Sequence, residues 1–219
     1  MKALIFDSSS IISLTLNDLL FILEPLKKAF DGEFFITQQV KYELVDRSLK
    51  IRRFKLGSLM IKNLIDKQVL KVKSNDFIKK EKGRLLDIAN NTFKVDKIGM
   101  ELIHAGEASC LALYNFLPTT KKAIVMDERT TRMLCESPEN LHKLLENKHH
   151  TRIQPNKNNY KEFNKFKIIR SSELAYIAYK KGIIDLPSTK KEALEALFYG
   201  LKYKGCTISH NEINVAKSL

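Results

Sequence analysis

Short apolar segments bounded by polar residues recur along this 219-residue chain, and longer stretches of helical periodicity separate them. Apolar runs of this length are typical of buried β-strands, whereas apolar residues repeating every three or four positions indicate helices packed on a core. Because strands alternate with helices, the pattern predicts an α/β protein, a three-layer α/β/α sandwich around a mostly parallel central sheet of about five strands. The predicted strands are residues 2–6, 34–36, 69–73, 123–126 and 167–169.

Capping and turn residues set the limits of the predicted helices. The first helix starts after Asp7 and runs to Pro25 or slightly beyond, and Thr37 is placed to cap the second. The region 76–115 is expected to be mostly helical, with a break around Gly106. The remaining predicted helices cover residues 47–67, 138–148, 171–182 and 190–203, and glycines follow the last two.

A single domain is expected over residues 1–219, because no internal repeat, low-complexity tract or long linker interrupts the alternation. Residues 151–165 form a polar connection rich in Asn and Lys, which is typical of an insertion. A closing helical segment at about 171–219 completes the predicted domain.

Four acidic residues follow predicted strands or begin helical segments near the same edge of the predicted sheet. Asp7 and Asp127 come directly after the first and fourth strands, whose carboxyl ends meet around one crevice in a parallel sheet. Glu43 and Glu107 lie in predicted helices beside it. Each acid alone has an ordinary interpretation as a helix cap or an exposed side chain. Together they predict a divalent-metal site, because converging carboxylates repel one another unless a cation lies between them.

The chain is strongly basic, with 38 Lys and Arg against 25 Asp and Glu and a formal net charge of +13. Such an excess attracts polyanions, although surplus lysine also serves solubility. Hydrophobic residues make up 44% of the chain, which is enough for a proper core. An acidic metal site in a basic protein indicates phosphodiester chemistry.

The cysteines and the amino-terminal segment give the expected location. Cys110, Cys135 and Cys206 lie far apart and lack the C-x-x-C spacing of a zinc or redox pair. The apolar run Ala3–Phe6 is too short for a signal peptide or a membrane span. We therefore expect reduced thiols, a cytoplasmic location and no membrane partner.

Four segments carry a resemblance in their order and spacing: Leu4-Ile5-Phe6-Asp7-Ser8-Ser9, Val40-Lys41-Tyr42-Glu43-Leu44, Gly106-Glu107-Ala108-Ser109-Cys110-Leu111-Ala112-Leu113 and Ile124-Val125-Met126-Asp127-Glu128-Arg129. They resemble the motifs of the PIN-domain nucleases, which include the VapC-type toxin ribonucleases. Residues 173–184 resemble the closing helix of one prokaryotic branch of these proteins. The resemblance runs over nearly the whole chain and implies a PIN-like fold.

The resemblance implies a metal-dependent endoribonuclease that cleaves RNA through water activated by carboxylate-bound Mg²⁺ or Mn²⁺. The implied catalytic and metal-binding residues are Asp7, Glu43, Glu107 and Asp127, with Glu128 as an auxiliary ligand. The expected substrate-binding residues are Ser9, Arg129, Arg132, Arg52 and Arg53. The expected partners are RNA, a second copy of the chain and, for the toxin of a toxin–antitoxin pair, an antitoxin protein.

Two departures from the family pattern leave the substrate open. Glu107 stands where many members have aspartate, and residues 134–166 form an insertion that is atypical of the family. A catalytically silent module that binds RNA or protein, and an RNA-processing nuclease without a toxin role, stay as alternatives. A phosphatase with an aspartate nucleophile is disfavoured, because position 9 is serine where that chemistry requires a second acid.

Overall fold

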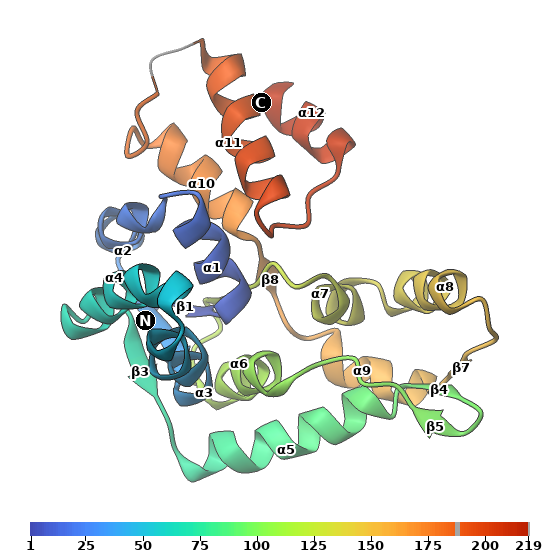
Figure 1. Cartoon of the computed structure of the whole chain (residues 1–219). Helices are drawn as coiled ribbons and strands as arrows, with labels where there is room; N and C mark the ends of the chain where they lie inside the picture. Colours follow the sequence, from blue (N-terminus) through green and yellow to red (C-terminus); the bar gives the residue numbers. More distant parts are fainter. Residues whose placement is uncertain (187–188, 219) are drawn as a thin grey trace.

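A five-stranded parallel sheet forms the centre of the computed structural model, which describes residues 1–186 and 189–218 (Figure 1). The strand order is β3-β2-β1-β6-β8, and helices flank the sheet. This arrangement confirms the predicted α/β sandwich and all five predicted strands. The strands are β1 (Ala3–Phe6), β2 (Glu33–Thr37), β3 (Lys71–Lys73), β6 (Lys122–Val125) and β8 (Ile168–Ile169).

β1 lies in the middle of the sheet because its four residues are all apolar and buried. Ile5 pairs with Phe35 of β2 on one side and with Ile124 of β6 on the other. The chain continues from β1 to β2 and β3 in one direction and adds β6 and β8 on the opposite side. The strand order therefore reverses between β1 and β6, the position at which parallel sheets usually bind ligands.

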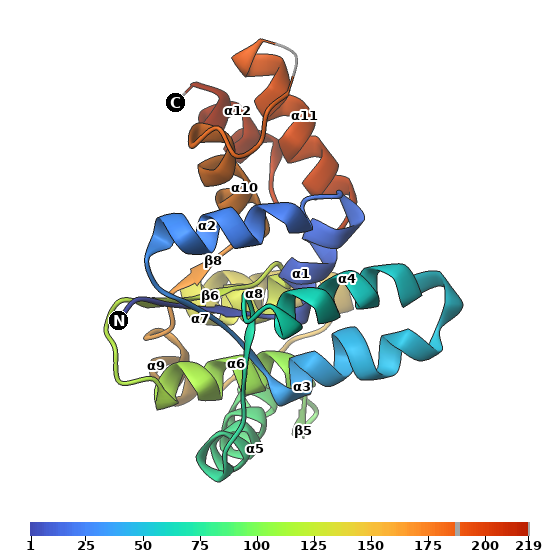
Figure 2. The same cartoon turned by 90° about the vertical axis from the view of Figure 1, so that its left-hand side faces the viewer.

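The two faces of the sheet are covered by different helices (Figure 2). α6 (Ala105–Phe116) contacts β1, β2 and β6, and α5 (Asp76–Asn90) packs along its outer side. Every residue from Gly106 to Tyr114 is buried, as expected for a helix between a sheet and a second helix. α1 (Ser8–Leu16) and α2 (Leu23–Phe30) lie on the opposite face.

The other helical elements connect these layers or extend from them. The short ones are η1 (Leu20–Ile22), α3 (Gln38–Lys41), the π-helical turn η2 (Tyr42–Arg47), η3 (Ser48–Lys50), η4 (Arg52–Phe54), η5 (Lys157–Asn159) and α9 (Tyr160–Phe163). The longer ones are α4 (Lys55–Asp66), α7 (Arg129–Glu136), α8 (Pro138–His149), α10 (Ser171–Lys180), α11 (Lys190–Tyr203) and α12 (His210–Ser218).

The prediction of one continuous helix from residue 8 to Pro25 is wrong. α1 ends at Leu16, and Asp18 adopts a left-handed backbone with φ of 57°. Aspartate tolerates this conformation better than most residues, so the Asn17-Asp18 pair ends the helix. Pro25 is the third residue of α2, where its missing N–H breaks no helical hydrogen bond.

The predicted break around Gly106 is confirmed but is longer than expected, since it covers residues 91–104 and α6 restarts at Ala105. This segment holds a hairpin of β4 (Phe93–Val95) and β5 (Ile98–Gly99). Asp96 and Lys97 form its two-residue turn with φ of 47° and 69°. The usual Asn-Gly or Asp-Gly signal for such a turn is absent, which explains why the periodicity did not reveal the hairpin.

Residues 134–166, the predicted insertion, form a lateral extension of the domain. α8 leads to β7 (Gln154–Pro155), which pairs with β4 to make a small antiparallel sheet in the order β5-β4-β7. Phe93 is fully buried there, with its ring stacked on His142 at a centroid distance of 5.6 Å. The insertion and the hairpin therefore share one apolar contact region.

The carboxyl-terminal helices form a second, smaller apolar cluster beside the main core. The predicted helices at 171–182 and 190–203 are confirmed as α10 and α11, whereas α12 was not predicted. Gly182 and Gly205 have positive φ after α10 and α11, as expected for glycines that end helices. The small cluster contains Leu194, Phe198, Ile208 and Ile213.

No single helix within the described ranges is long and apolar enough to cross a membrane. The segments Ser8–Leu16 and Leu20–Phe30 pass that test only when taken together, and they are bent by 117° against each other.

Candidate functional site

Asp7 is the centre of the candidate site and is completely buried. It follows β1 directly and caps α1: its Oδ2 accepts hydrogen bonds from the Ser9 N–H at 3.0 Å and from the Ser9 hydroxyl at 2.5 Å. The Ser9 hydroxyl oxygen also accepts a hydrogen bond from the Asp127 N–H at 3.0 Å. Ser9 therefore fixes the Asp7 carboxylate against the end of β6, and Asp7 itself supplies the helix cap.

Burial raises the pKa of Asp7 from its usual 3.8 to about 7. The negative charges of Glu107 and Glu43 add to this effect, while the two hydrogen bonds from Ser9 oppose it. Ionisation of this carboxyl group is therefore unfavourable, because burial and the neighbouring negative charges both destabilise the charged form. The charges of Glu43 and Glu107 thus act on Asp7 from two other elements, η2 and α6.

Glu43 approaches the site from η2, at the start of this π-helical turn. Its Oε2 accepts a hydrogen bond from the Ser8 hydroxyl at 2.9 Å, and its Oε1 accepts one from the Gln39 amide at 3.0 Å. Gly106 lies directly against the carboxylate, because a Cβ atom there would be 2.9 Å from Oε2. The start of α6 and the Glu43 carboxylate are therefore in close contact.

Glu107 is 9% exposed and lies in the first turn of α6. Its Oε2 accepts the His104 N–H at 2.8 Å, the return contact of a helix capping box. Burial raises the pKa of Glu107; backbone hydrogen bonds oppose the rise, and the charge of Glu128 adds to it. Glu107 thus interacts through its charge with both Asp7 and Glu128.

Cys110 lies beside Asp7 and is completely buried. Its Sγ is 4.0 Å from Asp7 Oδ1 and 3.7 Å from the Phe6 carbonyl oxygen. Burial, followed by the charges of Asp7, Glu107 and Glu43, raises the pKa of this thiol well above its usual value. Cys110 is therefore a neutral thiol in contact with the Asp7 carboxylate.

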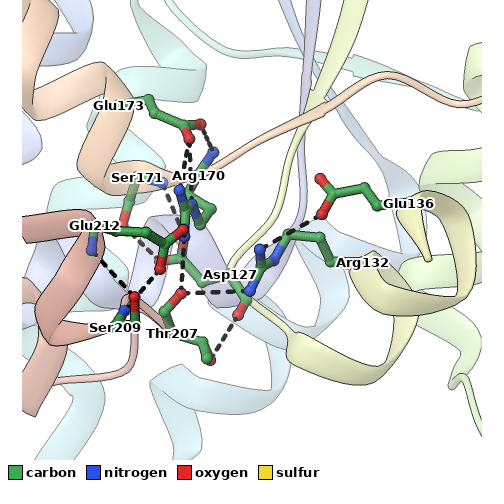
Figure 3. A network of polar contacts seen from close by, with 9 residues as sticks. All are labelled: Asp127, Arg132, Glu136, Arg170, Ser171, Glu173, Thr207, Ser209 and Glu212. Carbon is green, nitrogen blue, oxygen red and sulfur yellow. Dashed lines mark hydrogen bonds and ion pairs between the residues drawn. The ribbon is translucent and has the colours of Figure 1, made fainter. Parts of the chain in front are cut away.

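Both carboxylate oxygens of Asp127 bind Ser171, at the start of α10 (Figure 3). Its Oδ1 accepts the Ser171 N–H at 2.8 Å and its Oδ2 accepts the Ser171 hydroxyl at 2.6 Å. A serine at the start of a helix usually serves as its cap, but the N-cap residue of α10 is Arg170 and Ser171 binds Asp127 instead. Both carboxylate oxygens of Asp127 thus hold the first turn of α10.

The residues after Asp127 have structural contacts of their own. Glu128 caps α7 by accepting the Thr131 N–H at 2.6 Å. Arg132 donates to the Thr207 carbonyl oxygen at 3.3 Å and lies 3.5 Å from Glu136 (Figure 3). Arg129 is exposed beside Arg132 on the wall of a hollow of about 350 Å³.

Arg52 and Arg53 lie on η4, whose residues are all exposed. The Arg53 guanidinium stacks over the Phe54 ring at 4.7 Å. No contact of either arginine with the acidic residues was found among the described residues, so both belong to the outer surface beside η2 and not to the acidic cluster.

The carboxylates of Asp7, Glu43 and Glu107 interact through their charges, and the charge of Glu128 acts on Glu107. Oxygen donors of this kind suit hard divalent cations such as Mg²⁺ and Mn²⁺, and a cation would relieve the like-charge repulsion that raises the Asp7 pKa. Within residues 1–186 and 189–218, no three His, Cys, Asp or Glu side chains are already gathered in ligating geometry.

Four supporting residues of the site were not predicted as such: Ser8, Gln39, Cys110 and Ser171. Gln39 lies four residues before Glu43, a helical spacing that the sequence does contain. The contact between Ser171 and Asp127 joins residues 44 positions apart, so no local pattern signals it.

Comparison of the chain with protein-family models, with curated proteins and with solved structures found no match.

Proposed function

We propose that this protein is a metal-dependent endoribonuclease of the PIN-like type. The observation that carries the proposal is the buried carboxyl of Asp7, whose pKa is raised to about 7 by burial and by the charges of Glu107 and Glu43. A buried carboxyl surrounded by other acids at the switch point of a parallel sheet is costly for stability and is typical of a functional site. The net charge of +13 supports a polyanionic substrate.

Each acid has a defined task in the proposed reaction. Asp7, Glu43 and Glu107 would hold Mg²⁺ or Mn²⁺, which lowers the pKa of water and neutralises charge on the scissile phosphate. Ser9 keeps the Asp7 oxygens oriented, while Ser8 and Gln39 fix both oxygens of Glu43. Asp127 acts as a positioning residue that orients α10 and, through its N–H, Ser9.

The first test is a cleavage assay on labelled RNA with Mg²⁺, with Mn²⁺ and with EDTA. Cleavage is expected only with a divalent metal, and Glu107→Gln is expected to lower the rate at least about 100-fold. Asp76→Asn is the matched control, since the Asp76 side chain is fully exposed. Undiminished cleavage in EDTA would refute the proposed chemistry.

A catalytically silent RNA-binding module is the second candidate. The specific observation in its favour is that Ser171 occupies both carboxylate oxygens of Asp127. Binding and cleavage of the same labelled RNA distinguish the two candidate functions. RNA binding without cleavage under every metal condition supports the silent module. Ser171→Ala, which removes the hydroxyl bond to Asp127 Oδ2 but keeps the backbone bond to Oδ1, is then expected to leave cleavage absent.

A toxin role is the narrower form of the proposal. We expect induced expression of the unaltered chain in a bacterial host to arrest growth, and Asp7→Asn to abolish the arrest. Release of the arrest by a protein encoded beside this gene would identify the antitoxin. Growth unaffected by a cleavage-competent chain would favour an RNA-processing role.

A further inference from the structure

A second hollow, of about 400 Å³, lies at the carboxyl edge of the sheet between α3, β3 and the start of α5. Figure 1 shows α3 beside β3, and α5 beginning where the chain leaves that strand. Its volume is within the range of small-ligand sites, about 300–1,000 Å³. The lining combines a buried apolar residue, Ile78, with polar and basic side chains at the rim.

The hollow adjoins the acidic cluster. Gln39, on its wall, donates to Glu43 at 3.0 Å, and Tyr42 precedes Glu43 directly. Ser109, also on the wall, belongs to the same helix turn as Glu107, and its hydroxyl donates to the Gly106 carbonyl oxygen at 2.6 Å. The hollow therefore lies next to Glu43, through Gln39 and Tyr42, and against α6.

The rim carries three lysines, Lys73, Lys79 and Lys82, and one aromatic ring, Tyr42. Lys79 forms an ion pair with Asp76 at 3.2 Å, whereas no carboxylate partner of Lys73 or Lys82 was found among the described residues. The Tyr42 side chain is 51% exposed. Ammonium groups bind phosphate as point charges, and exposed aromatic rings stack on unpaired bases.

We propose that this hollow binds one nucleotide of single-stranded RNA next to the phosphate that is cleaved, with its base on Tyr42 and its phosphate on Lys73 and Lys82. The RNA must be single-stranded, because a base within a duplex has no free face for Tyr42. The position of the nucleotide relative to the cleaved bond rests on the proposed nuclease function. Binding at the hollow does not depend on it.

Binding of a five-nucleotide oligouridine, labelled with a fluorophore, is measured by anisotropy in EDTA, where no metal-dependent cleavage occurs. Tyr42→Ala is expected to weaken binding about 5- to 100-fold, and Tyr42→Phe to leave it within about twofold. The double variant Lys73→Ala with Lys82→Ala is expected to weaken binding at least about 10-fold and to flatten its salt dependence.

The matched control is the double variant Lys121→Ala with Lys143→Ala, which removes the same charge from exposed positions outside the hollow. An equal loss of RNA affinity in the two double variants would show that the RNA is attracted by net charge alone, and it would overturn the proposal. Unchanged binding in Tyr42→Ala would overturn it as well. If the protein cleaves RNA but Tyr42→Ala binds the oligouridine as the unaltered protein does, the binding site is refuted and the nuclease function is kept. If the hollow variants lose binding but the unaltered protein cleaves no RNA, the nuclease function is refuted and the binding site is kept.

Discussion

Gly106 leaves no space for a side chain beside Glu43, because a Cβ atom at Gly106 would lie 2.9 Å from Oε2 and 3.1 Å from Oε1 of that carboxylate. Side-chain atoms normally stay farther apart than this, so the carboxylate has to move if the residue is larger than glycine. The absence of a side chain at position 106 therefore sets how closely Glu43 approaches α6 and the other acids.

Gly106→Ala is expected to lower RNA cleavage at least about 10-fold while the fold stays intact, because the new methyl group displaces the end of the Glu43 side chain. Gly83→Ala is the control, since Gly83 lies within α5 with open space around it. That control is expected to stabilise the protein by about 0.5–1 kcal/mol without changing cleavage. Equal activity in the two variants would contradict the role of Gly106.

Asp7→Asn is expected to stabilise the metal-free protein at pH 8, by up to about 4 kcal/mol. The folded-state pKa of Asp7 is raised from 3.8 to about 7, so the folded protein binds the proton more tightly than the unfolded chain does. The unaltered protein therefore loses stability as the pH rises from about 4 to about 7, and the asparagine variant does not. Urea unfolding in EDTA at pH 4, 6 and 8 measures the difference. A constant difference across these values would contradict the raised pKa.

Divalent metal is expected to raise the melting temperature of the unaltered protein. Saturation at 100 times the dissociation constant adds about 2.7 kcal/mol at one site, and the effect should be larger at pH 8 than at pH 5 because the ligands must be ionised. Asp7→Asn should lose most of this shift, whereas Asp76→Asn, changed at a fully exposed side chain, should keep it. Calorimetry with MgCl₂ or MnCl₂ provides the measurement.

Arg170→Ala is expected to loosen α12. The Arg170 guanidinium donates to Glu212 at 2.7 Å, to the Thr207 carbonyl oxygen at 3.2 Å and to Glu173 at 2.9 Å, with only 12% of its side chain exposed (Figure 3). We expect a loss of about 1–3 kcal/mol and faster hydrogen exchange in residues 210–215.

Arg84→Ala is the matched control for Arg170→Ala. Arg84 also joins two glutamates, Glu81 and Glu162, but 44% of its side chain is exposed. Solvent screens such pairs, so this change should cost less than about 1 kcal/mol. Equal losses would show that burial of Arg170 contributes nothing to the attachment of α12.

The sheet was predictable from sequence because its central strand β1 is a continuous buried apolar run, while the segment of β3 alternates apolar and charged residues. The hairpin of β4 and β5 was not, since its Asp96-Lys97 turn lacks glycine and each strand is at most three residues long. α12 was missed because it has no periodic apolar stripe that would indicate a helix. Its buried apolar residue is Ile213, which packs in the small cluster with residues of α11.

Positions of the acids were predictable only as far as the backbone determines them. Asp7 and Asp127 both follow central strands, as predicted. The direction of the Asp127 carboxylate depends on Ser171, which approaches from a helix 44 residues later in the chain. The sequence could therefore place four acids at one edge of the sheet but could not show that one of them faces α10.

Metal-dependent cleavage by the acidic residues is tested best by the rate of RNA cleavage by the unaltered protein and by Asp7→Asn, each titrated with MnCl₂ at pH 8. We expect a rate that rises to saturation with metal in the unaltered protein and falls at least about 1,000-fold in Asp7→Asn, whose folded state is verified by circular dichroism. Equal cleavage by the two proteins at saturating metal would show that Asp7 does not take part in metal-dependent cleavage.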